Sequence, residues 1–166
     1  MRWIWIDTFV EFVSGQRAVA VKNVTLAEEY LHDHFPGYPV MPPSLMIEGM
    51  AQTAGILVGE VRNFQENVIL AKIRLAEFQE YPGPGDQIRY ETTIDSIDER
   101  AAVTSGTVFR NDRKIGRVDL IFSRMNNAGR SRDLPDHNFV FTEQFRHLLA
   151  TARHLCSNGD RKSDEE

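Results

Sequence analysis

The sequence predicts an α+β domain in which an antiparallel sheet wraps around one buried helix. Residues 44–61 are apolar on every face of a helix, which is typical of a helix enclosed by protein. Segments of β-branched and alternating residues, separated by short turns, lie before and after this helix. A chain of 166 residues has the length of one domain.

The first elements are predicted to be a β-hairpin and a short helix. Residues 17–24 are rich in β-branched residues and follow the turn Ser14-Gly15-Gln16, so we expect two paired strands here. Leu26 to His32 is predicted to be a short helix. The Thr25 hydroxyl would cap it, with Glu28 three residues on as the second half of a capping box.

The central helix is predicted to begin after a segment with four prolines and to be followed by the rest of the sheet. Small residues on it, Gly49, Ala51, Ala54 and Gly55, would let the sheet approach closely. The later strands are expected at residues 68–78, 88–95, 101–109 and 115–123, with a hairpin loop at 111–114. We therefore expect five to seven strands, mostly antiparallel.

The end of the chain has a different pattern. Residues 143–156 carry apolar side chains at helical spacing, with Thr142 as a cap, and predict a further helix. Residues 157–166 are too polar to fold and are expected to be disordered. We accordingly divide the chain into a domain at 1–125, an extension with a packed helix at 126–156 and a tail at 157–166.

The composition excludes several classes of function. A net charge of −5 gives no basic surface for nucleic acid. The single cysteine, Cys156, cannot form an internal disulfide, and no His/Cys cluster has zinc spacing, so we expect no structural metal. The apolar run at the N-terminus ends at Asp7, too short for a signal peptide or a membrane span. A soluble protein of the reducing cytoplasm, with no membrane insertion, is predicted.

One short segment predicts acid/base chemistry. His34 lies in a proline-rich loop, and Glu48 is the one carboxylate at the start of the apolar central helix. Packing of this helix would remove water from Glu48 and favour its neutral form, which could then donate a proton near neutral pH. The pair therefore predicts an active site with one base and one acid.

The residues around this pair resemble a known family. His34-Phe35-Pro36-Gly37, then Pro39-Val40-Met41-Pro42, then Glu48 within Ile-Glu-Gly-Met-Ala-Gln, is similar to the active-site signature of FabZ/FabA-type 3-hydroxyacyl-acyl-carrier-protein dehydratases, which have the hotdog fold. Residues 20–25, and Glu77-Phe78 followed by Pro84-Gly85-Asp86, extend the resemblance over roughly residues 6–123.

The resemblance implies a long central helix wrapped by a curved antiparallel sheet, and a homodimer, or a trimer of dimers, whose sheets join edge to edge. It implies that His34 removes the α-proton of a 3-hydroxyacyl thioester, while Glu48 of the partner subunit protonates the departing hydroxyl. The product would be a trans-2-enoyl thioester of fatty-acid or related lipid or polyketide biosynthesis. Glutamate at position 48 looks more like the FabZ branch, and no cofactor is implied.

The chain departs from the family at Pro43, where the family has a glycine whose amide would bond the thioester carbonyl. Proline has no amide to donate, although it is common at the first helical position. Either Ser44 or Leu45 supplies the amide, or the Ser44 hydroxyl replaces it, or the oxyanion site is lost and the protein only binds acyl thioesters. Loss of one such donor costs about 2.7–4 kcal/mol. A hotdog thioesterase, with Glu48 activating water and His34 assisting, is a further alternative.

Other residues have supporting roles in this interpretation. Gln52, one turn after Glu48, would hydrogen-bond its carboxyl group or a water, or simply pack. Gly37 and Pro42 would shape the loop, and Phe78 and Tyr81 would line an acyl tunnel. The basic residues available to an acidic acyl carrier protein are scattered, so a coenzyme A thioester stays open as the substrate. They are Arg74, Arg110, Arg113, Lys114, Arg117 and Arg124.

Overall fold

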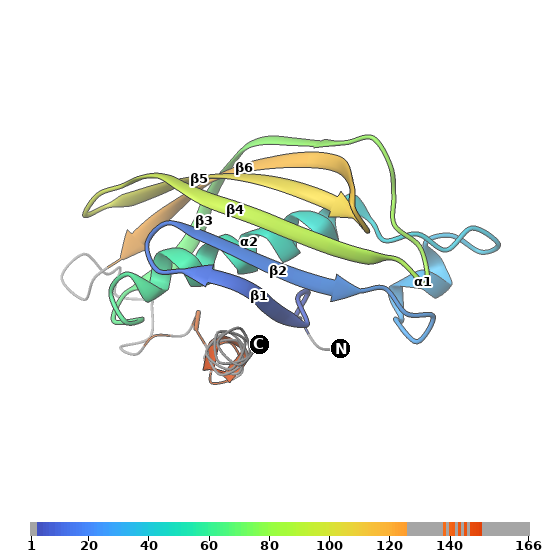
Figure 1. Cartoon of the computed structure of the whole chain (residues 1–166), viewed down its shortest axis with the longest axis horizontal. Helices are drawn as coiled ribbons and strands as arrows, with labels where there is room; N and C mark the ends of the chain where they lie inside the picture. Colours follow the sequence, from blue (N-terminus) through green and yellow to red (C-terminus); the bar gives the residue numbers. More distant parts are fainter. Residues whose placement is uncertain are drawn as a thin grey trace, which may run out of the picture.

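A computed structural model describes residues 3–125, together with 138, 140, 141, 143, 145 and 147–150. Figure 1 shows a sheet that curves around one long helix, α2 (Pro43–Glu60). The sheet has six strands in the order β1-β2-β4-β5-β6-β3, and every neighbouring pair is antiparallel. The α+β class and the helix wrapped by an antiparallel sheet are confirmed.

The strands and helices follow the periodicities of the sequence. Burial alternates residue by residue along most of β5, because successive side chains point to opposite faces of the sheet. On α2 every residue from Gly49 to Glu60 is buried, as expected of a helix that is apolar on all sides. The remaining elements are β1 (Thr8–Val13), β2 (Arg17–Asn23), α1 (Tyr30–Asp33), β3 (Asn67–Phe78), β4 (Gln87–Ile97), β5 (Ala101–Arg110) and β6 (Arg113–Met125).

Strand β3 lies at the edge of the sheet. It pairs with β6 on one side, with two register shifts, and within the described residues no strand pairs with its other side. Residues 71–74 of β3 are exposed, including Ile73, whose side chain is 44% exposed. An edge strand of this length presents unpaired backbone groups that can pair with another chain.

The short helix expected at residues 26–32 is wrong in position and in its cap. The observed helix α1 starts at Tyr30, and Glu29 precedes it without a side-chain capping bond. Glu28 accepts a hydrogen bond from Lys22 Nζ at 2.6 Å and is therefore not part of a capping box. An ion pair with Lys22 of β2 has taken the carboxylate that the local pattern assigned to the helix cap.

The helix predicted near the C-terminus is present at residues 143, 145 and 147–150. Its expected continuation to 156, the tail at 157–166 and residues 126–137 lie outside the described residues. The boundary between domain and extension at residue 125 stays a prediction. In the described part of the chain, no helix is long and apolar enough to cross a membrane.

Candidate active site

His34 lies in a loop that backbone hydrogen bonds hold at several points. Its own amide donates to Tyr30 O at 3.0 Å, and its carbonyl accepts from the Val40 amide at 2.7 Å. The loop is tied to the segment after β3 because the Met41 amide donates to Pro82 O at 2.7 Å. Gly37 has a φ of +81°, a conformation that L side chains rarely adopt, in keeping with its loop-shaping role. His34 is thus an exposed residue whose backbone is held by hydrogen bonds on both sides.

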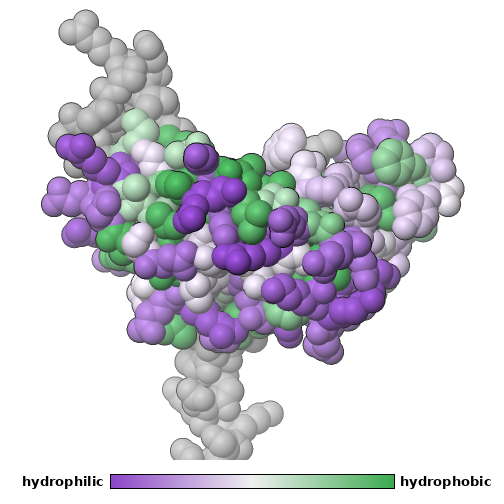
Figure 2. Space-filling view, turned by 90° about the horizontal axis from the view of Figure 1, so that it is seen from above, coloured by the Kyte–Doolittle hydropathy of each residue, from purple (hydrophilic) through white to green (hydrophobic). Residues whose placement is uncertain are grey.

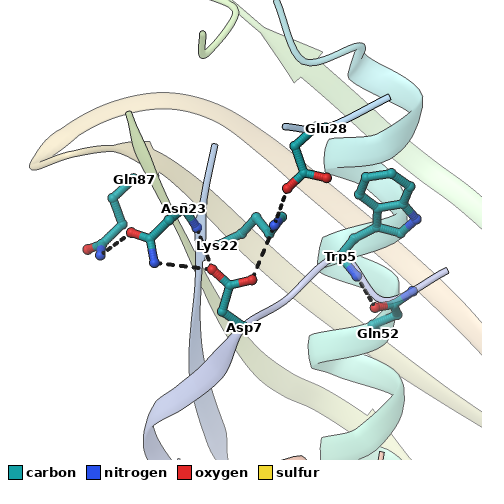
Figure 3. A network of polar contacts seen from close by, with 7 residues as sticks. All are labelled: Trp5, Asp7, Lys22, Asn23, Glu28, Gln52 and Gln87. Carbon is teal, nitrogen blue, oxygen red and sulfur yellow. Dashed lines mark hydrogen bonds and ion pairs between the residues drawn. The ribbon is translucent and has the colours of Figure 1, made fainter. Parts of the chain in front are cut away.

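Glu48 is held in place by Gln52, one turn further along α2. The Gln52 amide nitrogen donates to Glu48 Oε1 at 2.8 Å, as the spacing of four residues predicts, and also to Trp3 O at 2.7 Å. Gln52 Oε1 accepts from the Trp5 amide at 2.8 Å, as Figure 3 shows. Gln52 therefore connects the N-terminal segment to the candidate catalytic carboxylate. The Glu48 residue itself is half-buried, less than its sequence context predicted.

The first turn of α2 leaves one amide without an acceptor. Pro42 precedes the helix with φ −62° and ψ 146°, and Pro43 occupies the first helical position, so neither has an N–H. The Leu45 amide donates to Pro42 O at 3.0 Å. No acceptor within the described residues meets the Ser44 amide, which is the first free donor at the positive end of the helix.

Two cavities lie near these residues. The larger, of about 1060 Å³, is lined by His34, Pro42, Ser44 and Leu45 among others. The smaller, of about 370 Å³, is lined by Glu48 and Gln52. Trp3 lines both. Within one chain, His34 and Glu48 therefore face different cavities.

Phe78 and Tyr81 line neither of these cavities. Phe78 is half-buried and lies against Gly116, where an added Cβ would meet the Phe78 ring at 2.6 Å. Tyr81 is 44% exposed. Their assignment to an acyl tunnel stays a prediction that the single chain does not support.

The larger cavity has a polar wall that the sequence interpretation missed. Lys22 Nζ lies 2.6 Å from Glu28 and 3.2 Å from Asp7, which also accepts from the Asn23 amide (Figure 3). Burial by itself would lower the pKa of Lys22, but these two carboxylates outweigh it and hold the pKa above its ordinary value. The signal in the sequence was a lysine at the end of an otherwise apolar strand.

Two donors at the same cavity have no acceptor among the described residues. They are the Trp5 indole N–H and the Tyr30 hydroxyl, whose rings meet edge to face at 5.4 Å. Burial raises the pKa of the Tyr30 hydroxyl, which keeps its proton. Unsatisfied buried donors are costly, so a polar group or water belongs beside them. No group of three or more metal-ligating side chains occurs within the described residues.

The FabA-like domain family matches residues 4–119, a span that contains both His34 and Glu48. The chain belongs to the FabA-like family. It is 38% identical over 110 residues to 3-hydroxyacyl-[acyl-carrier-protein] dehydratase FabZ from Koribacter versatilis, an alignment that covers 65% of this chain and 70% of the relative. The FabZ of Caldanaerobacter subterraneus is 35% identical over 121 residues, covering 72% of this chain and 86% of the relative.

Solved structures agree on the fold. The dehydratase heterocomplex ApeI:P from Xenorhabdus doucetiae has a TM-score of 0.64 at 16% identity, covering 76% of this chain and 86% of the other. A hot-dog-like protein from Thermanaerovibrio acidaminovorans has a TM-score of 0.58 at 14% identity, covering 70% and 86%. The hotdog fold expected from the sequence is confirmed. The FabA-like match ends at residue 119, so the C-terminal helix lies beyond it.

Proposed function

We propose that this protein dehydrates 3-hydroxyacyl thioesters to trans-2-enoyl thioesters, with His34 as base and Glu48 as acid. The observation that carries the proposal is the arrangement of this pair. A histidine on a rigid loop leads directly into a helix whose carboxylate is held by Gln52, in a chain 38% identical to a FabZ dehydratase. The reaction would serve fatty-acid biosynthesis.

In the proposed reaction the His34 imidazole takes the proton from the α-carbon of the substrate. The carbon–oxygen bond at the β-carbon breaks as Glu48 gives its proton to the hydroxyl, which leaves as water. A double bond forms between the α- and β-carbons. Negative charge that develops on the thioester oxygen is met by the Ser44 amide, in place of the amide that Pro43 lacks. No cofactor takes part.

The site is completed in a homodimer. His34 and Glu48 of one chain face different cavities, while Glu48 is only half-buried and its cavity includes Ile69 and Leu70 of the free edge strand β3. Antiparallel pairing of two β3 strands would continue the sheet across the two subunits and set a second chain beside Glu48. That chain would bring its own His34 and remove the remaining water from Glu48. The association of three such dimers into a hexamer stays a prediction.

The substrate is carried by an acyl carrier protein, as the names of the FabZ relatives state for those enzymes. Four of the six basic residues considered for this contact form ion pairs within the chain: Arg110, Arg113, Arg117 and Arg124. Arg74 and Lys114 have no ion pair within the described residues. Among these six residues, Arg74 and Lys114 are therefore the first candidates for contact with an acidic carrier. The cytoplasmic location stays a prediction.

The test is to incubate the protein with 3-hydroxybutyryl and crotonyl thioesters. Reversible interconversion of the two is the expected result, whereas release of free thiol would mean a thioesterase and binding without turnover would mean a non-catalytic binder. Glu48→Gln should lower kcat by a factor of about 10²–10⁴, because the amide cannot give up a proton. Glu99→Gln, at an exposed turn outside both cavities, is the matched control and should leave kcat unchanged.

A further inference from the structure

The smaller cavity has the chemistry of a hydrocarbon-chain site. Its polar residues, Glu48 and Gln52, are on α2, and they adjoin Ala51 and Gly55 of the same helix. The rest of the wall is predominantly apolar and comes from Ile56, β3 and β6, with Trp3 at the N-terminus. Such a cavity suits an alkyl chain whose polar thioester end lies at the carboxylate.

The outer wall of this cavity comes from the C-terminal segment. Val140, Phe141 and Phe145 line the smaller cavity, and the helix that contains Phe145 presents Glu143, His147 and Leu148 to the larger one. Figure 1 shows this helix end-on, below β1. The helix thus contributes to both cavities, yet lies beyond residue 119, where the family match ends.

The beginning of the segment is anchored on the connection between α2 and β3. The Asn138 side-chain nitrogen donates to the carbonyls of Phe64 and Glu66, both at 2.9 Å. Its oxygen accepts from the amides of Val140 and Phe141 at 3.1 and 3.0 Å. Because the Asn138 side chain makes all four of these hydrogen bonds, it fixes the direction of the residues that follow it.

Phe141 adds a hydrophobic anchor. It is 6% exposed, and its ring meets Phe64 edge to face at 4.9 Å. It also fits against α2 at Gly59, where an added Cβ would lie 2.5 Å from the Phe141 ring. Phe145, in the helix that follows, lines the same cavity and completes the wall.

We propose that the C-terminal helix closes the acyl-chain pocket of this enzyme and that Phe145 limits the length of the chain it accepts. This inference rests on the proposed function. The ligand is the alkyl tail of a 3-hydroxyacyl thioester, and the tail ends against the Phe145 ring. The outer wall of the cavity belongs to this chain's own extension. The family-matched part of the sequence therefore does not by itself determine which acyl-chain lengths are accepted.

The test compares kcat/KM of the full-length protein for 3-hydroxybutyryl, 3-hydroxyhexanoyl, 3-hydroxyoctanoyl and 3-hydroxydecanoyl thioesters. Phe145→Ala should raise the decanoyl-to-butyryl ratio, because each further methylene that becomes buried gives about a fourfold gain, or roughly 0.8 kcal/mol. Room for two more methylenes gives about fifteenfold. Phe145→Trp should lower the same ratio. Phe12→Ala removes an equally half-buried ring outside both cavities and should leave the ratio unchanged.

If kcat/KM depended on acyl-chain length in the same way in wild type and in both Phe145 variants, the inference would be overturned. The proposed reaction would be unaffected by that result. Absence of turnover in wild type on every substrate would instead count against the proposed function. In that event the same comparison is made by direct binding, with saturated butyryl to decanoyl thioesters titrated against tryptophan fluorescence, since Trp3 lines the cavity. Equal length dependence of Kd in wild type and Phe145→Ala would then refute the pocket itself.

Discussion

Gln52 is the residue that holds Glu48, the proposed acid, in place. It is 7% exposed, and its amide oxygen and nitrogen both have partners: the Trp5 amide, the Trp3 carbonyl and Glu48. Because the nitrogen donates to Glu48, one carboxylate oxygen is fixed and the other is left for the substrate. The same bonds fix the N-terminal segment, which lines both cavities.

The Ser44 amide, rather than its hydroxyl, is the oxyanion donor in this account. Ser44→Ala keeps the amide and removes the hydroxyl, so kcat should stay within about threefold of wild type. Steady-state kinetics with a 3-hydroxybutyryl thioester measure it. A fall of about 10²–10³ would assign the donor to the hydroxyl instead, since that is the typical effect of removing one oxyanion donor.

Pro43→Gly tests the same oxyanion site by adding a donor instead of removing one. Glycine restores an amide at the first helical position, so a second donor should reach the thioester oxygen and raise kcat about tenfold or more. KM should change little, because the added bond strengthens only as charge develops on the oxygen. An unchanged kcat would mean that the oxygen does not lie at this end of the helix.

At the scale of elements, α2 depends on small residues where the sheet approaches it. A Cβ on Gly49 would lie 2.5 Å from Cζ and Oη of Tyr90, which is fully buried and cannot move aside. Gly49→Ala should therefore destabilise the protein by about 1–2 kcal/mol, since overpacking exceeds the gain of about 1 kcal/mol in helix propensity. Urea denaturation measures this free energy of unfolding.

Gly55→Ala is the matched control on the same helix. The nearest atom to its added Cβ is Phe122 Cε1 at 3.5 Å, an ordinary contact. This variant should be more stable than wild type by about 0.5–1 kcal/mol. If both variants shifted stability in the same direction, close packing at Gly49 would not be what distinguishes the two positions.

The elements with a clear period were predictable from the sequence, and one that depends on a side chain of another element was not. The central helix was predicted at 44–61 and is observed at Pro43–Glu60, because eighteen largely apolar residues leave no alternative to burial. Helix α1 was misplaced because Lys22, on another element, takes the Glu28 side chain. Lys22 is only six residues earlier in the chain, but the helical pattern alone does not show that a lysine of the preceding strand will contact Glu28.

For the whole molecule, the candidate catalytic pair could be picked out from the sequence and its surroundings could not. His34 and Glu48 stood out because a loop histidine and a helix carboxylate are unusual beside so many apolar residues. Trp3, Trp5 and Phe145 were missed as cavity residues. They reach α2 from the two ends of the chain, and only the folded sheet brings those ends together.

The free edge of the sheet makes the single chain an incomplete enzyme in this account. In one chain His34 and Glu48 line different cavities, and no strand among the described residues pairs with the outer edge of β3, beside Glu48. A symmetric dimer would form two equal sites, each with His34 of one subunit and Glu48 of the other. This claim is central, because the proposed chemistry depends on it.

Mixing two inactive variants tests the claim most directly. The His34→Ala and Glu48→Gln variants are mixed, unfolded and refolded together. The dehydration activity of the refolded mixture is then compared with that of each variant refolded alone. A heterodimer has one site with both native residues, so random pairing should restore about a quarter of the wild-type activity. If the mixture stays as inactive as its components while size-exclusion chromatography and mass spectrometry show that heterodimers have formed, the two residues do not meet across a subunit boundary.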